Sequence, residues 1–247
     1  MRGKGVTLQS HMTLQSQGFV LIDLPEIPAE ILDSYDNCPV DEYMGHGTRY
    51  KRFSQYRLRP VPQADKGWTF ELLPHRDYTA FKKFNPVGGG MRRTYGSIEV
   101  DFTPLIEFGA DALGLDRSED WQINVHQNRS RADADRPAPL TPEGIHHDGH
   151  EFVMIAVLRK VNVAGAETRL WKPNADEPFW RGILDERQAV LLDDRAIAHD
   201  VTEVLSANGH PAHRDIFITA FSRWKEKWYG DQHDEAVLEG DDAADGS

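Results

Sequence analysis

Short apolar runs, separated by loops rich in proline, glycine, asparagine and aspartate, are the main pattern in the second half of the chain. The clearest of them cover residues 121–127, 145–158, 168–171, 189–192 and 216–221. They have the length of strands and a content of β-branched and aromatic residues that is typical of strands. Since turn residues separate them, the pattern predicts a β-sandwich or β-barrel.

Helical periodicity occurs mainly before this region. Residues 28–35 follow a helical pattern, and so do residues 105–115, where apolar residues from Leu105 to Leu115 recur on one face. Helices first and strands afterwards do not match a repeating βαβ chain. We therefore expect a mainly β protein with N-terminal helices.

The length of 247 residues is ordinary for one β-domain with additions, and we expect residues 13–230 to form it. Residues 1–12 contain a Ser-His-Met sequence typical of a cloning scar, so we interpret them as a tag or a disordered leader. No run of about 18 apolar residues is present, so the sequence predicts no membrane span. The single Cys38 cannot form an internal disulfide, which fits a reducing cytoplasm.

The net charge of −12 is concentrated at one end of the chain. Residues 231–247 contain seven acidic side chains and no lysine or arginine, which leaves −5 for the rest. We expect residues 231–247 to be a disordered acidic tail. The remainder shows no basic face of the kind that nucleic-acid binding requires. One basic cluster is interpreted as a solvated strand face, and it comprises Arg49, Lys51, Arg52, Arg57 and Arg59.

Pairs of histidine and aspartate two residues apart are candidate metal ligands. The chain has three of them, at His75 and Asp77, at His146 and Asp148, and at His213 and Asp215. Chance alone supplies roughly one such pair in a chain of this composition, and a polar turn with incidental histidines remains the alternative. Only the middle pair runs into a strand-like segment, residues 152–158.

On a strand, side chains at positions i and i+2 share one face, so His146 and Asp148 can point at one metal ion. A third ligand is offered by His199, which ends a second predicted strand after a tight turn. Two imidazoles and one carboxylate form the facial triad of non-haem iron oxygenases. A second candidate is Arg214, at the start of the strand 216–221. An arginine at the mouth of a buried strand needs a carboxylate partner, although a surface arginine is the alternative.

Several motifs together resemble one known family, the iron(II)- and 2-oxoglutarate-dependent dioxygenases, and within it the bacterial L-isoleucine-hydroxylase branch. The motifs are VHQNR at 125–129, PEGIHHDGH at 142–150, RKVNVAGAET at 159–168, HDVT at 199–202 and RD at 214–215. A looser resemblance extends over residues 49–52 and 85–93, so that it covers about residues 45–225. The chain departs from the family pattern at Ala166, where a second glycine is usual, and at residues 81–84, where substrate could be recognised.

The resemblance implies a double-stranded β-helix, a jelly roll of the cupin kind. It implies that His146, Asp148 and His199 bind Fe(II) and that Arg214 holds the C5 carboxylate of the cosubstrate 2-oxoglutarate. It further implies O2 as the oxidant, ascorbate as a supporting reductant, and release of succinate and CO2. The implied reaction is hydroxylation of an unactivated C–H bond of a free L-amino acid or a close relative.

Candidate substrate contacts are less specific. If residues 123–129 form a strand, Gln127 and Arg129 share a face and could contact 2-oxoglutarate or a substrate carboxylate, unless that face is solvated. Further carboxylate partners are Arg92 and Arg93, and the ammonium partners we consider are Glu151 and Glu167. We interpret three other histidines as structural or ligand-orienting, namely His126, His147 and His150.

Two other functions remain open at this point. One keeps the iron chemistry but uses a larger natural-product, sugar or tethered substrate. The other is a non-catalytic cupin module in which the three ligands hold zinc. We expect a small-molecule substrate and neither a nucleic-acid nor a membrane partner, and the oligomeric state stays undetermined.

Overall fold

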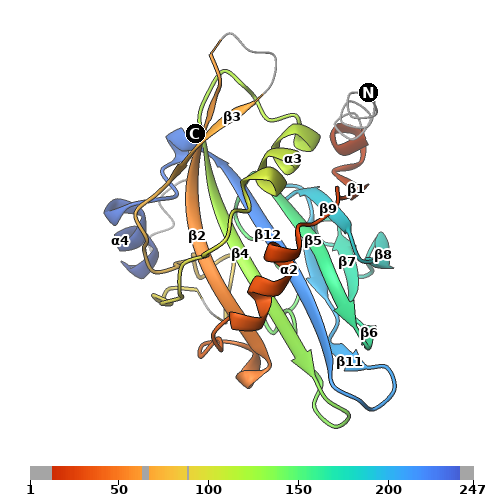
Figure 1. The fold of residues 1–247 in the computed structure, drawn as a ribbon. Coiled ribbons are helices and arrows are strands. Elements are labelled where there is room, and N and C mark those ends of the chain that lie inside the picture. Colours follow the sequence, from red (N-terminus) through yellow and green to blue (C-terminus); the bar gives the residue numbers. More distant parts are fainter. Residues whose placement is uncertain (1–12, 63–66, 88, 240–247) are drawn as a thin grey trace.

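The computed structural model describes residues 13–62, 67–87 and 89–239 (Figure 1). Its helices are α2 (Ala29–Ser34), α3 (Thr103–Leu113) and α4 (Asp231–Glu239), with 3-10 turns η1 (Tyr35–Asn37), η2 (Gly45–Gly47) and η3 (Trp224–Glu226). The strands are β1 (Phe19–Asp23), β2 (Arg49–Pro60), β3 (Trp68–Leu72), β4 (Trp121–Ala132), β5 (Phe152–Val161), β6 (Val163–Gly165), β7 (Glu167–Trp171), β8 (Trp180–Ile183), β9 (Gln188–Asp193), β10 (Ala198–Val201), β11 (Val204–Ser206) and β12 (Ala212–Arg223).

Antiparallel sheets build the fold. A seven-stranded sheet has the order β1-β9-β5-β12-β4-β2-β3, and two smaller sheets have the orders β10-β7-β8 and β11-β6. Helices α2 and α3 lie against one face of the large sheet (Figure 1). Its other face packs on the smaller sheets through a second apolar core that includes Leu170 of β7. The expected jelly roll with N-terminal helices is therefore confirmed.

Strand β12 shows how the large sheet serves both layers. It pairs with β4 on one side and with β5 on the other. Phe217 and Phe221 belong to the helix-side core, whereas Ile216 and Ala220 belong to the core between the sheets. Because side chains alternate along a strand, the residues that share a face with Ile216 point between the sheets. That space holds the candidate site.

The predicted helices and most predicted strands form close to the expected positions. Helix α3 ends where Gly114 takes a left-handed conformation with φ of 64° and its N–H bonds to the carbonyl of Asp111, which is a common helix stop. Residues 145–151 differ from the prediction, since they form a loop and β5 begins only at Phe152. None of the helices within the described ranges is long and apolar enough to cross a membrane.

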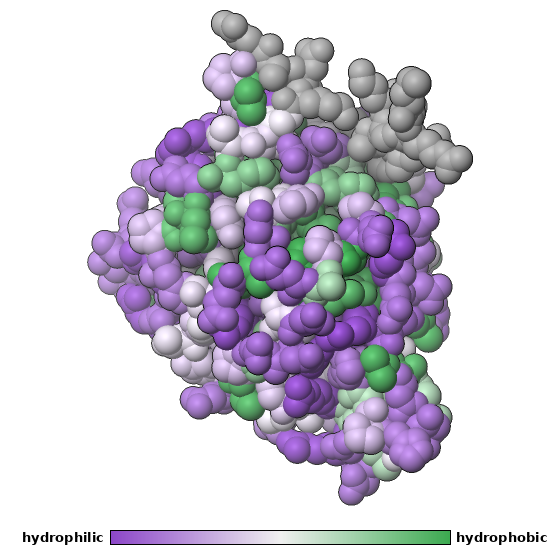
Figure 2. Space-filling model, in the orientation of Figure 1, coloured by the Kyte–Doolittle hydropathy of each residue, from purple (hydrophilic) through white to green (hydrophobic). Residues whose placement is uncertain are grey.

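The helix-covered face of the molecule is mostly hydrophilic. Figure 2 shows that apolar side chains on this face gather in small areas separated by polar ones. Scattered apolar exposure of this kind is ordinary for a folded domain.

The prediction of a disordered tail from residue 231 is wrong for its first nine residues, which form α4. Val237 of this helix is fully buried, and Asp234 is 3% exposed. Asp234 accepts a hydrogen bond from Thr79 at 3.2 Å and forms an ion pair with Arg76 at 2.6 Å. The acidic residues thus find a cationic partner elsewhere in the fold, which a charge count cannot show. Residues 1–12 and 240–247, the expected leader and the rest of the tail, lie outside the described residues.

We expect Asp234→Ala to lower the free energy of unfolding by about 1 to 3 kcal/mol, because a nearly buried carboxylate with two partners is lost. For a chain of this size, that loss lowers the melting temperature by about 2 to 4 °C per kcal/mol. Glu235→Ala is the matched control, since Glu235 is exposed on the same helix. Equal melting of the two variants in a thermal scan would show that the contacts of Asp234 contribute nothing to stability.

Candidate active site

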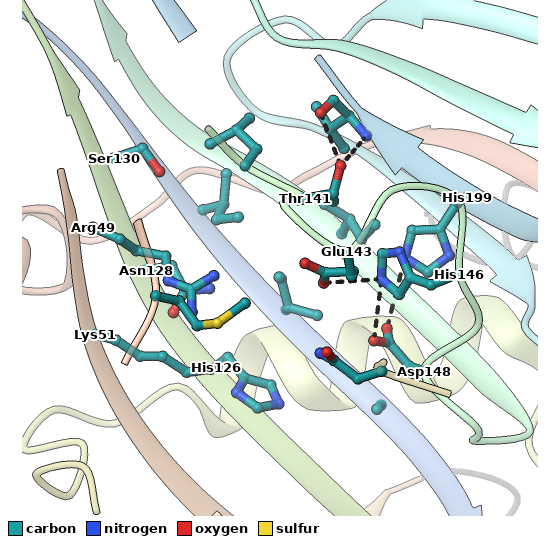
Figure 3. A pocket seen from close by; sticks show the side chains of 18 of the residues that line it. Arg49, Lys51, His126, Asn128, Ser130, Thr141, Glu143, His146, Asp148 and His199 are labelled. Carbon is teal, nitrogen blue, oxygen red and sulfur yellow. Dashed lines mark hydrogen bonds and ion pairs between the residues drawn. The ribbon is translucent and has the colours of Figure 1, made fainter. Parts of the chain in front are cut away.

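A cavity between the large sheet and the smaller sheets contains the three predicted metal ligands (Figure 3). His146 and Asp148 come from the loop before β5, and His199 comes from β10. The three side chains offer ligand atoms that all lie within 4.8 Å of one another. Among the described residues, this is the one such group of histidine, cysteine and acidic side chains.

Two backbone hydrogen bonds bring the histidines together, although no strand carries His146 and Asp148. The His146 N–H donates to the His199 carbonyl at 3.1 Å, and the His199 N–H donates back at 2.9 Å. The Asp148 carboxylate then lies 3.7 Å from Nε2 of each histidine. The prediction that a strand carries His146 and Asp148 was wrong. The two backbone hydrogen bonds form an isolated β-bridge between His146 and His199, which brings the three side chains together as expected.

The protonation of the histidines suits metal binding. Nδ1 of His146 lies 2.9 Å from the Gly144 carbonyl, so Nδ1 carries a proton and Nε2 is the nitrogen that can bind a metal. Burial lowers the pKa of His199 to about 4, so its imidazole is neutral near pH 7. Burial opposes ionisation of Asp148, but His199 and His146 outweigh it and lower the pKa of that carboxyl. Burial opposes protonation of His146, but Asp148 and Glu143 outweigh it and raise the pKa of that imidazole, so a metal ion would displace a proton when it binds there. The three side chains, two imidazoles and one carboxylate, are the donor set of a facial iron site.

A buried carboxylate, Asp194, holds the loop that carries these ligands. It accepts backbone hydrogen bonds from Asp148 at 3.0 Å, from Gly149 at 2.7 Å and from His150 at 3.1 Å. Gly149 has a φ of 88°, and a side chain there would collide with the ring of Phe84. The loop is thus fixed from both sides, and Asp194 is a positioning residue.

We expect Asp194→Ala to reduce metal affinity by about 10- to 100-fold, as is usual when a group that orients metal ligands is lost. The neighbouring Asp193→Ala is the control, because its carboxylate bonds only the nearby Arg195 N–H. Metal titration of the two variants measures the difference. Equal affinities would mean that the loop is held without Asp194.

The other histidines near the site have different surroundings. His147 does not belong to the metal-ligand cluster and contacts the carbonyl of Asp194. His150 contacts Ser222 at 2.8 Å through Nδ1, which supports the structural interpretation. Both His126 and His150 line the cavity beside the metal ligands, which is compatible with a structural or ligand-orienting role.

Arg214 is the most unusual cation of the cavity. It projects from β12, is 2% exposed and lines the same cavity as the metal ligands. Burial alone lowers the pKa of its guanidinium to about 10, so no carboxylate offsets the cost. Within the described part of the chain, its Nη2 has no hydrogen-bond partner. Among the described residues, no side chain is therefore the carboxylate partner that the sequence argument requires.

The structure contradicts the predicted site roles of Gln127 and Arg129. Both lie on the helix-facing side of β4, whereas His126 and Asn128 line the cavity. Gln127 donates a hydrogen bond to Ser34 at 2.7 Å. Arg129 is held by ion pairs to Asp215 at 2.6 Å and to Asp36 at 2.5 Å. Neither side chain is available to a ligand in the cavity.

Most of the other suggested substrate contacts also lie elsewhere. Arg92 is half-exposed beside Asp234, and Glu151 pairs with Arg223 at 2.9 Å. Glu167 does not line the cavity, whereas Arg93 does.

The sequence reasoning missed Glu143 and Lys51. Glu143 stands in the PEGIHHDGH motif, which was the signal that could have found it. Lys51 and Arg49 were interpreted as part of a solvated face, but they are 6% and 9% exposed and line the cavity. Of the same cluster, Arg57 lies near the other end of β2 and pairs with Asp120.

Comparison with known proteins agrees with the site. The 2OG-Fe dioxygenase family matches residues 32–220. L-isoleucine-4-hydroxylase of Bacillus thuringiensis is 29% identical over 200 residues, which cover 77% of each chain. The 3(1)-hydroxy-L-isoleucine 4-dioxygenase of Pantoea ananatis is 24% identical over 211 residues, which cover 80% of this chain and 82% of the relative.

Solved structures support the fold. A BsmA homologue from Methylobium petroleophilum superimposes with a TM-score of 0.74 at 24% identity, covering 87% of this chain and 92% of the other. The resemblance to the isoleucine-hydroxylase branch is thereby confirmed by relatives at the level of sequence and by the shared jelly roll. With most of its length matched and the metal-ligand motif in place, the chain belongs to the 2OG-Fe dioxygenase family and is a 2-oxoglutarate-dependent dioxygenase.

Proposed function

We propose that the protein hydroxylates an unactivated C–H bond of a free L-amino acid or a close relative, with release of succinate and CO2. The observation that carries this proposal is the combination, in one cavity, of the His146, Asp148 and His199 cluster with Arg214, whose Nη2 has no hydrogen-bond partner among the described residues. The two relatives named above, whose names specify isoleucine and a hydroxyisoleucine, support an amino-acid substrate.

The residues fit the two groups that the family uses. His146, Asp148 and His199 would hold an iron(II) ion through three ligand atoms, and about three positions would stay open for other ligands. Arg214 provides the buried cation that the distal carboxylate of 2-oxoglutarate needs, because a guanidinium matches a carboxylate bidentately. When bound, iron and 2-oxoglutarate activate O2, so that one oxygen atom enters succinate and the other enters the substrate.

The protein's own residues orient the reactants and exclude water. His146 and His199 direct their Nε2 atoms toward Asp148, and Asp194 fixes the loop that carries His146 and Asp148. Ile155, Ile216 and Ile218 form apolar walls of the cavity. Such walls strengthen charge recognition, since electrostatic interactions are stronger away from water. The position of oxidation is then set by which substrate carbon the site holds nearest to the iron.

A structural zinc module is a poorer explanation of the same cavity. Structural zinc sites usually close around four ligands, and the described residues bring three together. Such a module also gives no reason to bury Arg214 without a partner.

The test is a screen in which the protein is incubated with Fe(II), ascorbate, O2, 2-oxoglutarate and single free amino acids. We expect succinate to form in step with a product that has gained one oxygen atom, measured by mass spectrometry. If only a carrier-tethered, peptide or sugar substrate is oxidised, the free amino acid is the wrong substrate class. If no substrate increases succinate formation, hydroxylation itself is the wrong assignment.

A further inference from the structure

Two cations of the cavity, Lys51 and Arg93, are buried without an ion-paired carboxylate in the part of the chain that the structure describes. Lys51 is 6% exposed and Arg93 is 2% exposed, and both line the cavity of the metal ligands. Nε and Nη2 of Arg93 are buried without a hydrogen-bond partner among the residues that the structure describes. Within the same described ranges, neither cation forms an ion pair with an acidic side chain.

The neighbouring Arg49 provides an internal comparison. It lies two residues before Lys51 on the same face of β2, and it forms an ion pair with Asp41 at 2.6 Å. The fold therefore pairs Arg49 directly with a carboxylate, whereas Lys51 forms no ion pair among the described residues, although Asp41 and Asp148 lie within electrostatic reach of it. Because an uncompensated buried charge costs several kcal/mol, Lys51 and Arg93 point to an anionic ligand.

Aromatic rings hold the two cations in place. Nζ of Lys51 lies 4.6 Å from the Tyr95 ring centre and 4.9 Å from the Tyr78 ring centre. The Arg93 guanidinium lies 4.6 Å from the Tyr78 ring centre. A cation–π contact contributes about 0.5 to 2 kcal/mol, which is less than the cost of burying a charge. The rings thus position the cations without satisfying them.

This pair is separate from Arg214. In the large sheet, Arg214 of β12 and Arg49 of β2 both lie opposite Ser130 of β4, and Lys51 lies opposite Asn128. Lys51 is therefore two strands away from β12, a separation of about 10 Å between backbone positions. If one short dicarboxylate occupies the metal position and Arg214, Lys51 and Arg93 stay available for another anion.

A carboxylate of opposite sign, Glu143, borders the metal ligands. Its Oε2 is buried without a hydrogen-bond partner in the described part of the chain, and its Oε1 lies 3.7 Å from Nε2 of His146. Figure 3 shows Glu143 next to His146, with Lys51 projecting from β2 on the other side of the cavity. Burial raises the pKa of Tyr78 to about 12, with Arg93 lowering it and Asp148 and Glu143 raising it, so this phenol lies within reach of both signs of charge.

We propose that Lys51 and Arg93 bind the carboxylate of the primary substrate and that Glu143 binds its ammonium group. This inference rests on the proposed function and names the residues that recognise the amino acid. A free amino acid carries both charges at a fixed separation, so the three side chains together select the zwitterion. Substrates whose carboxylate is esterified, amidated or joined to a carrier lose one half of this recognition.

The test measures binding by calorimetry, without turnover, on protein loaded with Fe(II) and 2-oxoglutarate in the absence of O2. The probes are L-isoleucine, its carboxamide, and the carboxylic acid that lacks the amino group. We expect unmodified protein to bind L-isoleucine at least about tenfold more tightly than either analogue, because each analogue leaves a buried charge unpaired.

The variants separate the two poles. Arg93→Met and Lys51→Met should each lower the affinity for L-isoleucine by about tenfold or more and leave the affinity for the carboxamide unchanged. Glu143→Gln should lower the affinity for L-isoleucine but not the affinity for the carboxylic acid that lacks an amino group. Arg131→Met is the control, since Arg131 is exposed and stacks on Tyr50. The melting temperature of Arg93→Met should not fall, because the substitution removes an unpaired buried charge.

Each other result overturns a defined part of the argument. If Arg93→Met lowers the affinities for the acid and the amide equally, the residue is structural. If it lowers the affinity for 2-oxoglutarate instead, Lys51 and Arg93 bind the cosubstrate. If amino acids are hydroxylated yet no variant distinguishes the analogues, the charge recognition is wrong and the proposed function stands. If no free amino acid binds the unmodified protein, both fall together.

Discussion

Alanine at His146, Asp148 or His199 is expected to abolish turnover and to weaken Fe(II) binding by more than about a hundredfold. The estimate follows because loss of a group that only orients a ligand already costs about 10- to 100-fold, and here a ligand itself is removed. Their three ligand atoms lie within 4.8 Å of one another, so each contributes directly to one position. Metal titration and succinate formation measure the two effects.

Two histidines from the other His-x-Asp pairs are the controls. His75 contacts the Tyr95 carbonyl at 2.8 Å, and His213 lies opposite Val161 in the sheet. Neither lines the cavity, so His75→Ala and His213→Ala should keep metal affinity nearly unchanged. A protein that lost its metal with His75→Ala and kept it with His146→Ala would require a different metal site.

Arg214→Ala is expected to raise the apparent constant for 2-oxoglutarate by about a hundredfold or more while iron stays bound. Removing one partner of a buried ion pair costs roughly 3 to 5 kcal/mol. That free energy corresponds to about two to three and a half decades in affinity. The effect should be confined to the cosubstrate, because Arg214 does not belong to the metal-ligand cluster.

Arg214→Lys tests whether the planar guanidinium matters in addition to the charge. We expect it to recover only part of the affinity, since lysine cannot bind a carboxylate bidentately. Arg131→Ala, an exposed arginine on β4, is the neutral comparison. A rise of less than about fivefold for Arg214→Ala would move the anchor to another cation of the cavity, Arg93 or Lys51.

The metal ligands could be found from the sequence because their signal is local. His146 and Asp148 stand two residues apart before an apolar run, and the chemistry of the donor set names the third partner. What the sequence could not show is that a loop, rather than a strand, carries them. The hydrogen bonds that shape this loop come from Asp194, almost fifty residues away in the chain.

The error at Gln127 and Arg129 has a simple geometric cause. Strand β4 is buried on both faces, so polarity alone does not show which face meets the cavity. Trp121, Ile123 and Val125 pack in the helix-side core, and the same parity places the next two odd residues with them. Extending the parity of the apolar positions would have placed His126 and Asn128 in the cavity instead.

Charge counts failed where partners are distant. Lys51 and Arg49 looked solvated because five basic residues occur close together. In the structure, both side chains are on the face of β2 that lines the cavity. The tail looked disordered because its acidic residues outnumber its apolar ones, yet Arg76 pairs with Asp231 and Asp234. Both cases depend on contacts that only the tertiary structure defines.

The two halves of the site are held in different ways, and this has a consequence for hydrogen exchange. Arg214 belongs to β12, whose backbone is paired along its length with both β4 and β5, so its amides should exchange only when the whole sheet opens. His146 belongs to a loop that is held by two backbone bonds to β10 and by the Asp194 carboxylate, so its amides can exchange through a local opening that leaves the sheet intact. Removing the metal should therefore speed amide exchange in residues 144–150 and leave β12 protected. The metal-free enzyme can then take up iron while the strand that carries Arg214 stays folded.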